Sequence, residues 1–246
     1  MCGRYYLQRD PAGLARYFDA GPPTPNHPPS WNIAPTQASL VLRRNPTTGA
    51  RQLDVLRWGL VPHWAKDASG GARLINARAE TVAEKPSFRD AFRQRRCIVP
   101  MDGFYEWMQG TDPKQPFAVA LRGDVPMGVA GLWEGWKQPD GTWLRTYSVI
   151  TCAAAGRQSL LHPRTPVILP ASRWPAWLGE PAAGACDPGE LLRPAEDALL
   201  NYWPVSPRVG KVSENDPGLL ERTAMELRAE WSTLDDPPSL GTMDLS

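Results

Sequence analysis

Short apolar runs broken by glycine and proline dominate the middle of the chain. Two such runs, Ser39–Arg44 and Leu53–Trp58, flank the turn-forming sequence Asn-Pro-Thr-Thr-Gly and predict a β-hairpin. Six more runs are predicted strands: Cys97–Pro100, Phe104–Trp107, Phe117–Leu121, Met127–Trp133, Trp143–Thr151 and Val167–Leu169. Many short strands separated by turns are typical of a closed or nearly closed antiparallel sheet.

Helical periodicity is confined to short stretches of the sequence. The predicted helices are residues 14–20, Lys85–Arg95, Trp174–Leu178, Glu190–Tyr202 (interrupted by Pro194) and Leu219–Trp231. The sequence shows no internal repeat and no interdomain linker. The pattern therefore predicts an α+β fold, in which a single domain has an antiparallel β-barrel-like core and flanking short helices.

The composition narrows the class of protein. Proline accounts for 27 of 246 residues, which favours turns and short strands over long helices. No stretch approaches 18 uninterrupted apolar residues, so no membrane span is expected, and the N-terminus lacks the apolar run of a signal peptide. The four cysteines, at positions 2, 97, 152 and 186, are too far apart for a disulfide scaffold. A cytoplasmic protein with free thiols is predicted, associated with the nucleoid if the protein is bacterial.

The net charge of +1 conceals an uneven distribution. Residues 1–179 contain 22 Lys and Arg against 13 Asp and Glu, whereas residues 180–246 contain 5 against 13. Between Arg73 and Arg96 there are seven basic and three acidic residues. A basic body is typical of a protein that binds a polyanion.

Cys2 is the residue with the most distinctive chemistry. Removal of Met1 would leave a free 1,2-aminothiol at the start of the chain. An α-amine has a pKa of about 7.7–8.0, so a substantial fraction is uncharged near neutral pH and can attack an aldehyde to form an imine. The adjacent thiol can then add to the imine carbon and close a thiazolidine ring. Taken alone, a cysteine at position 2 more often has no chemical role.

A series of motifs gives Cys2 a context. They are CGR at 2–4, WNIAPT at 31–36, RWGLVPHW at 57–64, INARAET at 75–81, KPSFRDAFRQRRCIVPMDGFYEW at 85–107, AGLWEGW at 130–136, HPRTPVIL at 162–169, PVS at 204–206 and END at 214–216. In order and spacing this series closely resembles the SOS-response-associated peptidase (SRAP) family, the abasic-site processing proteins of bacteria and eukaryotes. The resemblance covers about residues 2–217. Residues 1–217 are therefore expected to form the family domain, and residues 218–246 a C-terminal helix or tail of unknown role.

The resemblance implies a covalent mechanism. Family members link their N-terminal cysteine to the open-chain aldehyde of an abasic site in single-stranded DNA, and the thiazolidine product shields the lesion. Matching the motifs one residue at a time implies that Cys2 forms the crosslink, Asn76 positions the reacting centre, Glu106 is the acid/base and His162 is the active-site histidine. An acid or imidazole suits the proton donation that imine formation requires.

The resemblance and the local charge together predict the DNA contacts. Arg4 and Arg78 match family arginines that hold the DNA backbone, and Arg164 is a further candidate for phosphate. Trp31, Trp58, Trp64 and Trp107 flank the motifs and could stack on bases, and Trp64 is the chosen candidate. The sequence departs from the usual family pattern at Thr165, in HPRTP, and at Gly210.

Three functions remain open at this stage. The leading one is a crosslinking enzyme of abasic sites, with self-removal of Met1 and a lyase side reaction as additional activities. The second is a thiol peptidase that uses Cys2 to cut proteins, and the third is a non-covalent single-stranded DNA-binding module. No cofactor is expected, and no metal site, because the chain has no CxxC or HxxxH pair. The predicted partner is single-stranded DNA with abasic sites, no membrane is involved, and the chain is expected to be a monomer.

Overall fold

Five strands close into a barrel in the computed structural model, which describes residues 2–110, 113–181, 184 and 186–224. They pair in the order β10-β4-β3-β6-β9, and β9 pairs with β10 to complete the ring. The strands are β3 (Ala38–Arg44), β4 (Arg51–Trp58), β6 (Arg96–Met101), β9 (Met127–Lys137) and β10 (Trp143–Ala153). Their inward side chains form one buried apolar cluster. The predicted α+β single domain with a barrel core is confirmed.

Strand β10 also joins the barrel to the segments that carry the motifs. Its C-terminal half pairs with β5 (Asn76–Arg78) and with β11 (Arg164–Pro166). The β10–β4 and β10–β5 pairings are parallel, whereas all the other pairings of β10 are antiparallel. β5 therefore continues the line of β4 along β10, and brings the INARAET motif beside the HPRTP motif.

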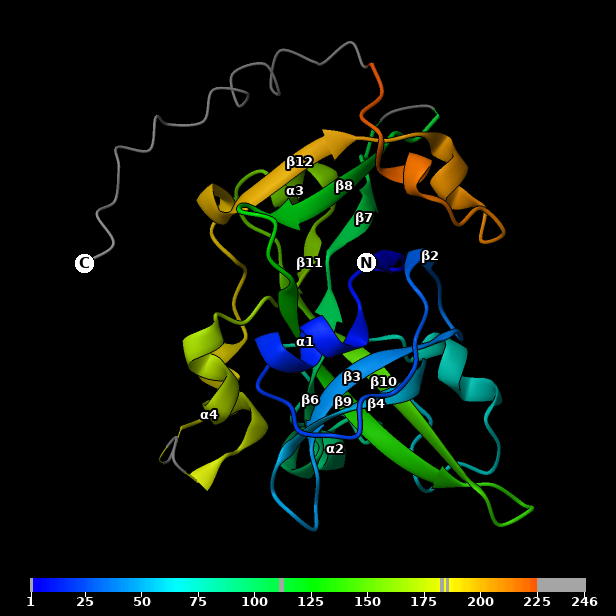
Figure 1. Ribbon diagram of the computed structural model, residues 1–246, viewed down its shortest axis with the longest axis vertical. Helices are drawn as coiled ribbons and strands as arrows, with labels where there is room; N and C mark the ends of the chain where they lie inside the picture. The colour runs from blue at the N-terminus through cyan, green and yellow to red at the C-terminus, as the bar shows by residue number, and fades with distance from the viewer. Residues whose placement is uncertain (1, 111–112, 182–183, 185, 225–246) are drawn as a thin grey trace.

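A second sheet of five strands covers one end of the barrel. Its order is β12-β8-β7-β1-β2, formed by β1 (Tyr5–Leu7), β2 (Ser30–Ile33), β7 (Gly103–Trp107), β8 (Pro116–Leu121) and β12 (Leu200–Pro204). β7 follows β6 after a single residue, so one stretch of chain runs from the barrel into this sheet. Figure 1 shows β7, β8 and β12 at one end of the molecule, the barrel strands at the other, and the N-terminus between them.

The helices are short and lie outside the barrel. They are α1 (Pro11–Tyr17), α2 (Arg89–Gln94), α3 (Gln158–Leu161) and α4 (Trp174–Leu178). The Asp10 side chain caps α1 by accepting from the Gly13 amide at 2.7 Å. Gly179, in the left-handed conformation at φ 69°, ends α4. The helix predicted at Trp174–Leu178 is confirmed, and those at 14–20 and Lys85–Arg95 exist with shifted or shorter bounds. None of the described helices has the length and apolar character needed to cross a membrane.

Some predicted elements are wrong or displaced. The helix predicted at Glu190–Tyr202 is two short 3₁₀ turns followed by strand β12, because Pro194 cannot donate a helical hydrogen bond and the apolar end of the segment pairs with β8. The strand predicted at Val167–Leu169 lies earlier, as β11. Strands β1, β2 and β5 are too short for their patterns to stand out. Of the helix predicted at Leu219–Trp231, residues 225–231 lie outside the described residues.

Candidate active site at the N-terminus

Cys2 lies where the second sheet meets the barrel. β1 pairs antiparallel with β7, with Tyr5 opposite Phe104, and the Tyr105 amide donates to the Arg4 carbonyl at 2.9 Å. The side chain of Cys2 is fully buried and belongs to the apolar cluster of the barrel. The first residues of the chain are therefore fixed by strand pairing.

Asn76 is joined directly to Cys2. Its Nδ2 donates to the Cys2 carbonyl at 2.8 Å, across 74 positions of sequence. Parallel pairing of β5 with β10, with Asn76 opposite Val149, sets the position of the amide. Asn76 Oδ1 is also buried, and it has no hydrogen-bond donor among the described residues. The amide thus holds the Cys2 backbone and leaves one buried acceptor at the same place.

Glu106 supplies a buried negative charge beside the thiol. It lies on β7, the strand that pairs with β1, and its side chain is buried. Burial and, after it, the Glu106 charge raise the pKa of the Cys2 thiol to about 12, whereas the backbone N–H of Arg4 acts in the opposite direction. The thiol is therefore neutral in the folded chain near pH 7, with a carboxyl group close enough to interact with it.

The α3–β11 segment brings His162 to the same region. A small pocket is bounded by Glu106 on one side and by Gln158, Arg164 and Thr165 on the other, so this segment packs against β7. His162 directly follows α3 and is half-buried. The Arg164 amide donates to its Nδ1 at 3.0 Å, and the same ring nitrogen lies 3.3 Å from the Arg164 carbonyl oxygen, so the backbone of Arg164 fixes the ring.

The three predicted phosphate-binding arginines have different surroundings. Arg4 donates to the carbonyls of Gly3 and Gly210, and partial burial lowers its pKa. Arg78 is exposed, and its side chain makes no hydrogen bond or ion pair with any described residue. It lies two residues after Asn76 on β5, so both side chains lie on the same face of that strand.

Arg164 already has a carboxylate partner. Its guanidinium makes a bidentate ion pair with Glu80, at 2.9 and 3.0 Å, and also contacts the carbonyl and hydroxyl of Thr151. The guanidinium in turn holds the pKa of the Glu80 carboxyl below its ordinary value. Arg164 thus ties β11 and β10 to the residues after β5, and a phosphate would have to compete with Glu80 for it.

Comparison with known proteins identifies the family. The family model described as SOS response associated peptidase (SRAP) matches residues 1–212. The chain belongs to the SRAP family. The abasic site processing protein YoqW of Bacillus subtilis (strain 168) is 37% identical over 225 residues, covering 90% of this chain and 99% of that protein. The abasic site processing protein HMCES of Mus musculus is 28% identical over 239 residues, covering 82% of this chain and 67% of that protein.

Solved structures agree on the fold. A crystal structure of a protein from Bacteroides thetaiotaomicron superposes with a TM-score of 0.81 at 22% identity, covering 91% of this chain and all of that one. A crystal structure of a protein from Bordetella bronchiseptica has a TM-score of 0.71 at 26% identity, covering 83% of this chain. The barrel with the second sheet at one end is therefore the architecture of this SRAP chain.

The tryptophans divide clearly between the core and the surface of this SRAP chain. Trp58 is fully buried and donates to the Ile75 carbonyl at 2.9 Å, so it is not available to stack on a base. Trp31 and Trp107 are half-buried. Trp64 is 56% exposed, as a side chain that stacks on a DNA base must be.

Sequence reasoning missed two tyrosines that adjoin the thiol. The hydroxyls of Tyr5 and Tyr147 are 2.6 Å apart and fully buried. Burial raises the pKa of both, and the neighbouring Cys2 thiol adds to the rise in each. Both residues stand in apolar strand runs, and that pattern gives no sign that their hydroxyls meet beside Cys2.

The two departures from the family pattern have simple surroundings. The Thr165 hydroxyl is buried and donates to Gln158 Oε1, so this SRAP chain fills the position with a satisfied polar pair below His162. Gly210 is exposed, and its carbonyl accepts from Arg4. Within the part of the chain that the structure describes, no three His, Cys, Asp or Glu side chains come together to hold a metal ion.

Proposed function

We propose that this SRAP protein processes abasic sites in single-stranded DNA by forming a covalent crosslink through Cys2. The observation that carries the proposal is the junction of Cys2 with Asn76 and Glu106, three residues from distant motifs that meet at the start of the chain. The names of the relatives, which are called abasic site processing proteins, support abasic DNA as the substrate.

The proposed reaction needs no group beyond the aminothiol and the aldehyde. Once Met1 is removed, the Cys2 amine attacks the aldehyde carbon of the ring-opened sugar and forms a carbinolamine. Loss of one water gives the imine: Glu106 or His162 takes the proton that leaves the nitrogen and gives a proton to the departing hydroxyl, so the group ends the step as it began. The Cys2 sulfur then adds to the imine carbon, its proton passes to the nitrogen, and a thiazolidine closes.

The surroundings of Cys2 suit each step. Asn76 Nδ2 fixes the residue through its carbonyl, and the buried Oδ1 has room in its bonding pattern for an N–H of the Cys2 amine. A neutral thiol beside a carboxyl group does not compete as an anion with the amine, and Glu106 can relay the thiol proton to the nitrogen when the ring closes. The exposed cation of Arg78 on the same strand is suited to a DNA phosphate.

The decisive experiment is intact-mass measurement after incubation with an oligonucleotide that carries one abasic site. The wild type should gain the oligonucleotide mass less one water, and an intact oligonucleotide should give no adduct. Cys2→Ala should give no stable adduct, although its α-amine should still form an imine that borohydride traps. Cys186→Ala, which changes a half-buried cysteine, is the matched control and should react as the wild type does.

The same spectra test the competing functions. A stable adduct that survives in Cys2→Ala, or no adduct with the wild type, would contradict the proposal. Oligonucleotide binding without any covalent species would favour the non-covalent module. Retention of Met1 in Glu106→Ala but not in the wild type would show that the protein removes its own Met1.

A further inference from the structure

A second pocket, of about 600 Å³, opens between α2 and the β9–β10 hairpin. Its lining includes two tryptophans, two arginines, a histidine and a glutamate: Trp133, Trp143, Arg95, Arg145, His63 and Glu134. None of these residues has a part in the proposed reaction at Cys2.

The aromatic wall of this pocket presents a ring face to solvent. Trp143 is 62% exposed and stands beside Gly135, where a Cβ atom would lie 3.5 Å from the indole. With no side chain at position 135, the indole can lie this close to the neighbouring strand and still remain largely exposed. Trp133 has a cation on one face, because the Arg43 guanidinium lies 4.5 Å from its ring centroid. Trp143 is thus the side chain available for stacking.

The charges around the pocket leave a positive excess. Glu134 is neutralised by Arg95 at 2.9 Å and lies 3.3 Å from His63, and Asp90 is 3.7 Å from Arg89. By contrast, Arg93, Lys137 and Arg145 are exposed and form no ion pair with any described residue. The last part of the basic stretch between Arg73 and Arg96 thus lies on α2 and directly after it, and Arg95 lines this pocket.

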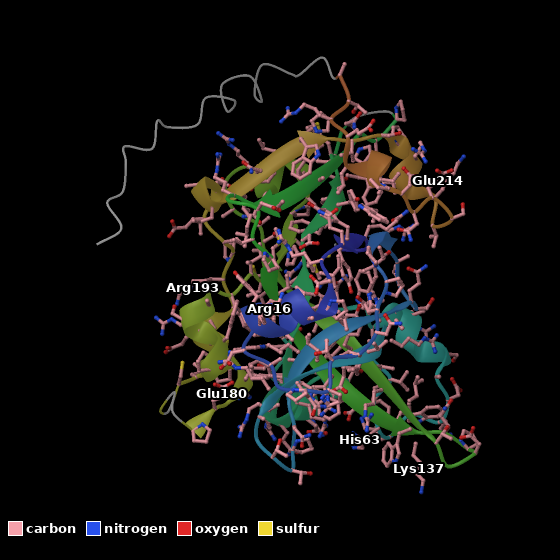
Figure 2. All side chains as sticks on the ribbon, viewed as in Figure 1. Arg16, His63, Lys137, Glu180, Arg193 and Glu214 are labelled. Atoms are coloured by element: carbon pink, nitrogen blue, oxygen red, sulfur yellow. The ribbon has the colours of Figure 1, made fainter. Side chains whose placement is uncertain are left out.

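The pocket lies well away from Cys2. Figure 2 shows His63 and Lys137 at the barrel end of the molecule, whereas Figure 1 marks the N-terminus near the second sheet. Strand β10 gives the scale, because Val149 pairs with Asn76, which contacts Cys2, and Arg145 lies four residues earlier, about 13 Å along the strand. Single-strand sites on proteins cover roughly 4–16 nucleotides, so one strand is long enough to reach both places.

We propose that this pocket is a second single-stranded nucleic-acid site, in which a base stacks on Trp143 and its phosphate pairs with Arg145. The site takes part of the strand several nucleotides from the abasic site. The inference rests on the proposed function for its choice of DNA as the polyanion, but the site requires no covalent chemistry. Exposed aromatic rings interleaved with unpaired cations are the combination that binds single strands without sequence preference.

The test measures fluorescence anisotropy with labelled oligothymidylate of about 20 nucleotides, which has no abasic site. Trp143→Ala should weaken binding by at least about fivefold, because one stacked base is lost. Arg145→Ala should also weaken binding, because the contact with the phosphate is lost. Trp143→Phe should restore most of the affinity lost in Trp143→Ala. Arg193→Ala, which removes an arginine labelled on a different part of the molecule in Figure 2, is the matched control and should bind as the wild type does.

A second arm separates this inference from the proposed function. An abasic oligonucleotide of about three nucleotides, with the abasic residue in the middle, extends only one nucleotide to either side and cannot reach the second site, so Trp143→Ala should crosslink it at the wild-type rate. The second site would be overturned if Trp143→Ala and Arg145→Ala bound the longer oligonucleotide with an affinity within twofold of the wild type. Failure of the wild type to crosslink the short abasic oligonucleotide would overturn the proposed function and leave the anisotropy result to stand by itself.

Discussion

In the proposed reaction Cys2 is a nucleophile, yet its thiol is buried and has a raised pKa, which is unusual for a reactive cysteine. Reactive cysteines in general are partly exposed and have a lowered pKa, because the thiolate is the nucleophile. Cys2 is fully buried, and its pKa is raised to about 12. In the proposed reaction the amine attacks first, so the thiol need not be a thiolate until the imine lies against it. A neutral buried thiol then avoids unwanted reactions with other electrophiles.

The raised pKa of Cys2 predicts a loss of stability at alkaline pH. The folded chain holds the thiol proton to about pH 12, against an ordinary value of 9.0, so the unfolded chain releases it first as the pH rises. The stabilisation is complete below about pH 9 and declines above it, by about 2 kcal/mol at about pH 10.5. Urea unfolding should therefore show a steeper decline between about pH 8 and 10.5 for the wild type than for Cys2→Ala.

Cysteine substitution elsewhere provides the control for this experiment. Cys186→Ala should keep the wild-type decline, because Cys186 is only half-buried. Cys2 contributes to the raised pKa of Tyr5 and Tyr147, so the part of their titration that depends on the thiol belongs to the difference between the wild type and Cys2→Ala. Equal slopes for the wild type and Cys2→Ala would show that the thiol is not held neutral by the fold.

Strand β7 connects the stability of the fold to the site. It begins one residue after barrel strand β6, pairs with both β1 and β8, and carries Glu106. The residue between β6 and β7 is Asp102, whose carboxylate accepts from the Gln8 amide at 2.7 Å and from Arg9 Nε at 2.7 Å. The end of β1 and the start of β7 are thereby fixed to each other, and with them the position of Glu106 relative to the start of the chain.

Gly103 is the position at which this connection is most sensitive. A Cβ atom there would lie 2.5 Å from the Val119 carbonyl oxygen and 2.5 Å from the Tyr6 hydroxyl. Gly103→Ala should therefore displace β7 and destabilise the fold by about 1–3 kcal/mol in urea unfolding, with slower crosslinking because Glu106 moves. Gly210→Ala has no atom within 4 Å of the added Cβ and should unfold as the wild type does. A fully stable Gly103→Ala would show that β7 tolerates the shift.

At the scale of the whole molecule, attraction to DNA must be local. The net charge is only +1, and 13 of the 26 acidic residues lie after residue 179. Several arginines form ion pairs within the protein, such as Arg164 with Glu80 and Arg51 with Glu180. The cations left for a phosphate backbone are the exposed ones near the two candidate sites, among them Arg78 and Arg145.

The salt dependence of binding tests this distribution. Each phosphate contact with a single strand contributes roughly 0.7 to the slope of log affinity against log salt concentration. Arg78→Ala should lower the slope for single-stranded DNA by about 0.7, as measured by anisotropy over a series of salt concentrations. Arg193→Ala should leave the slope unchanged, and a similar loss in both variants would mean that Arg78 contributes only general charge.

The sequence by itself determined the local elements and the types of residue at the site. Alternating runs around Asn-Pro-Thr-Thr-Gly define the β3–β4 hairpin, and the order of the motifs identifies Cys2, Asn76, Glu106 and His162 as candidates whose roles stay predictions. These features depend on neighbours in the chain, which is why periodicity and spacing can reveal them. The strand pattern was also enough to predict a barrel.

Only the tertiary structure decided what each side chain meets. Trp58 and Trp64 stand in one motif, yet one is buried and the other exposed. Arg164 meets Glu80 because β10 lies between β5 and β11. Asn76 meets Cys2 across 74 residues because the pairing of β5 with β10 sets its position. Such contacts are set by strand pairing between distant segments, and the free energy of that pairing depends on the packing of the whole core rather than on any local pattern.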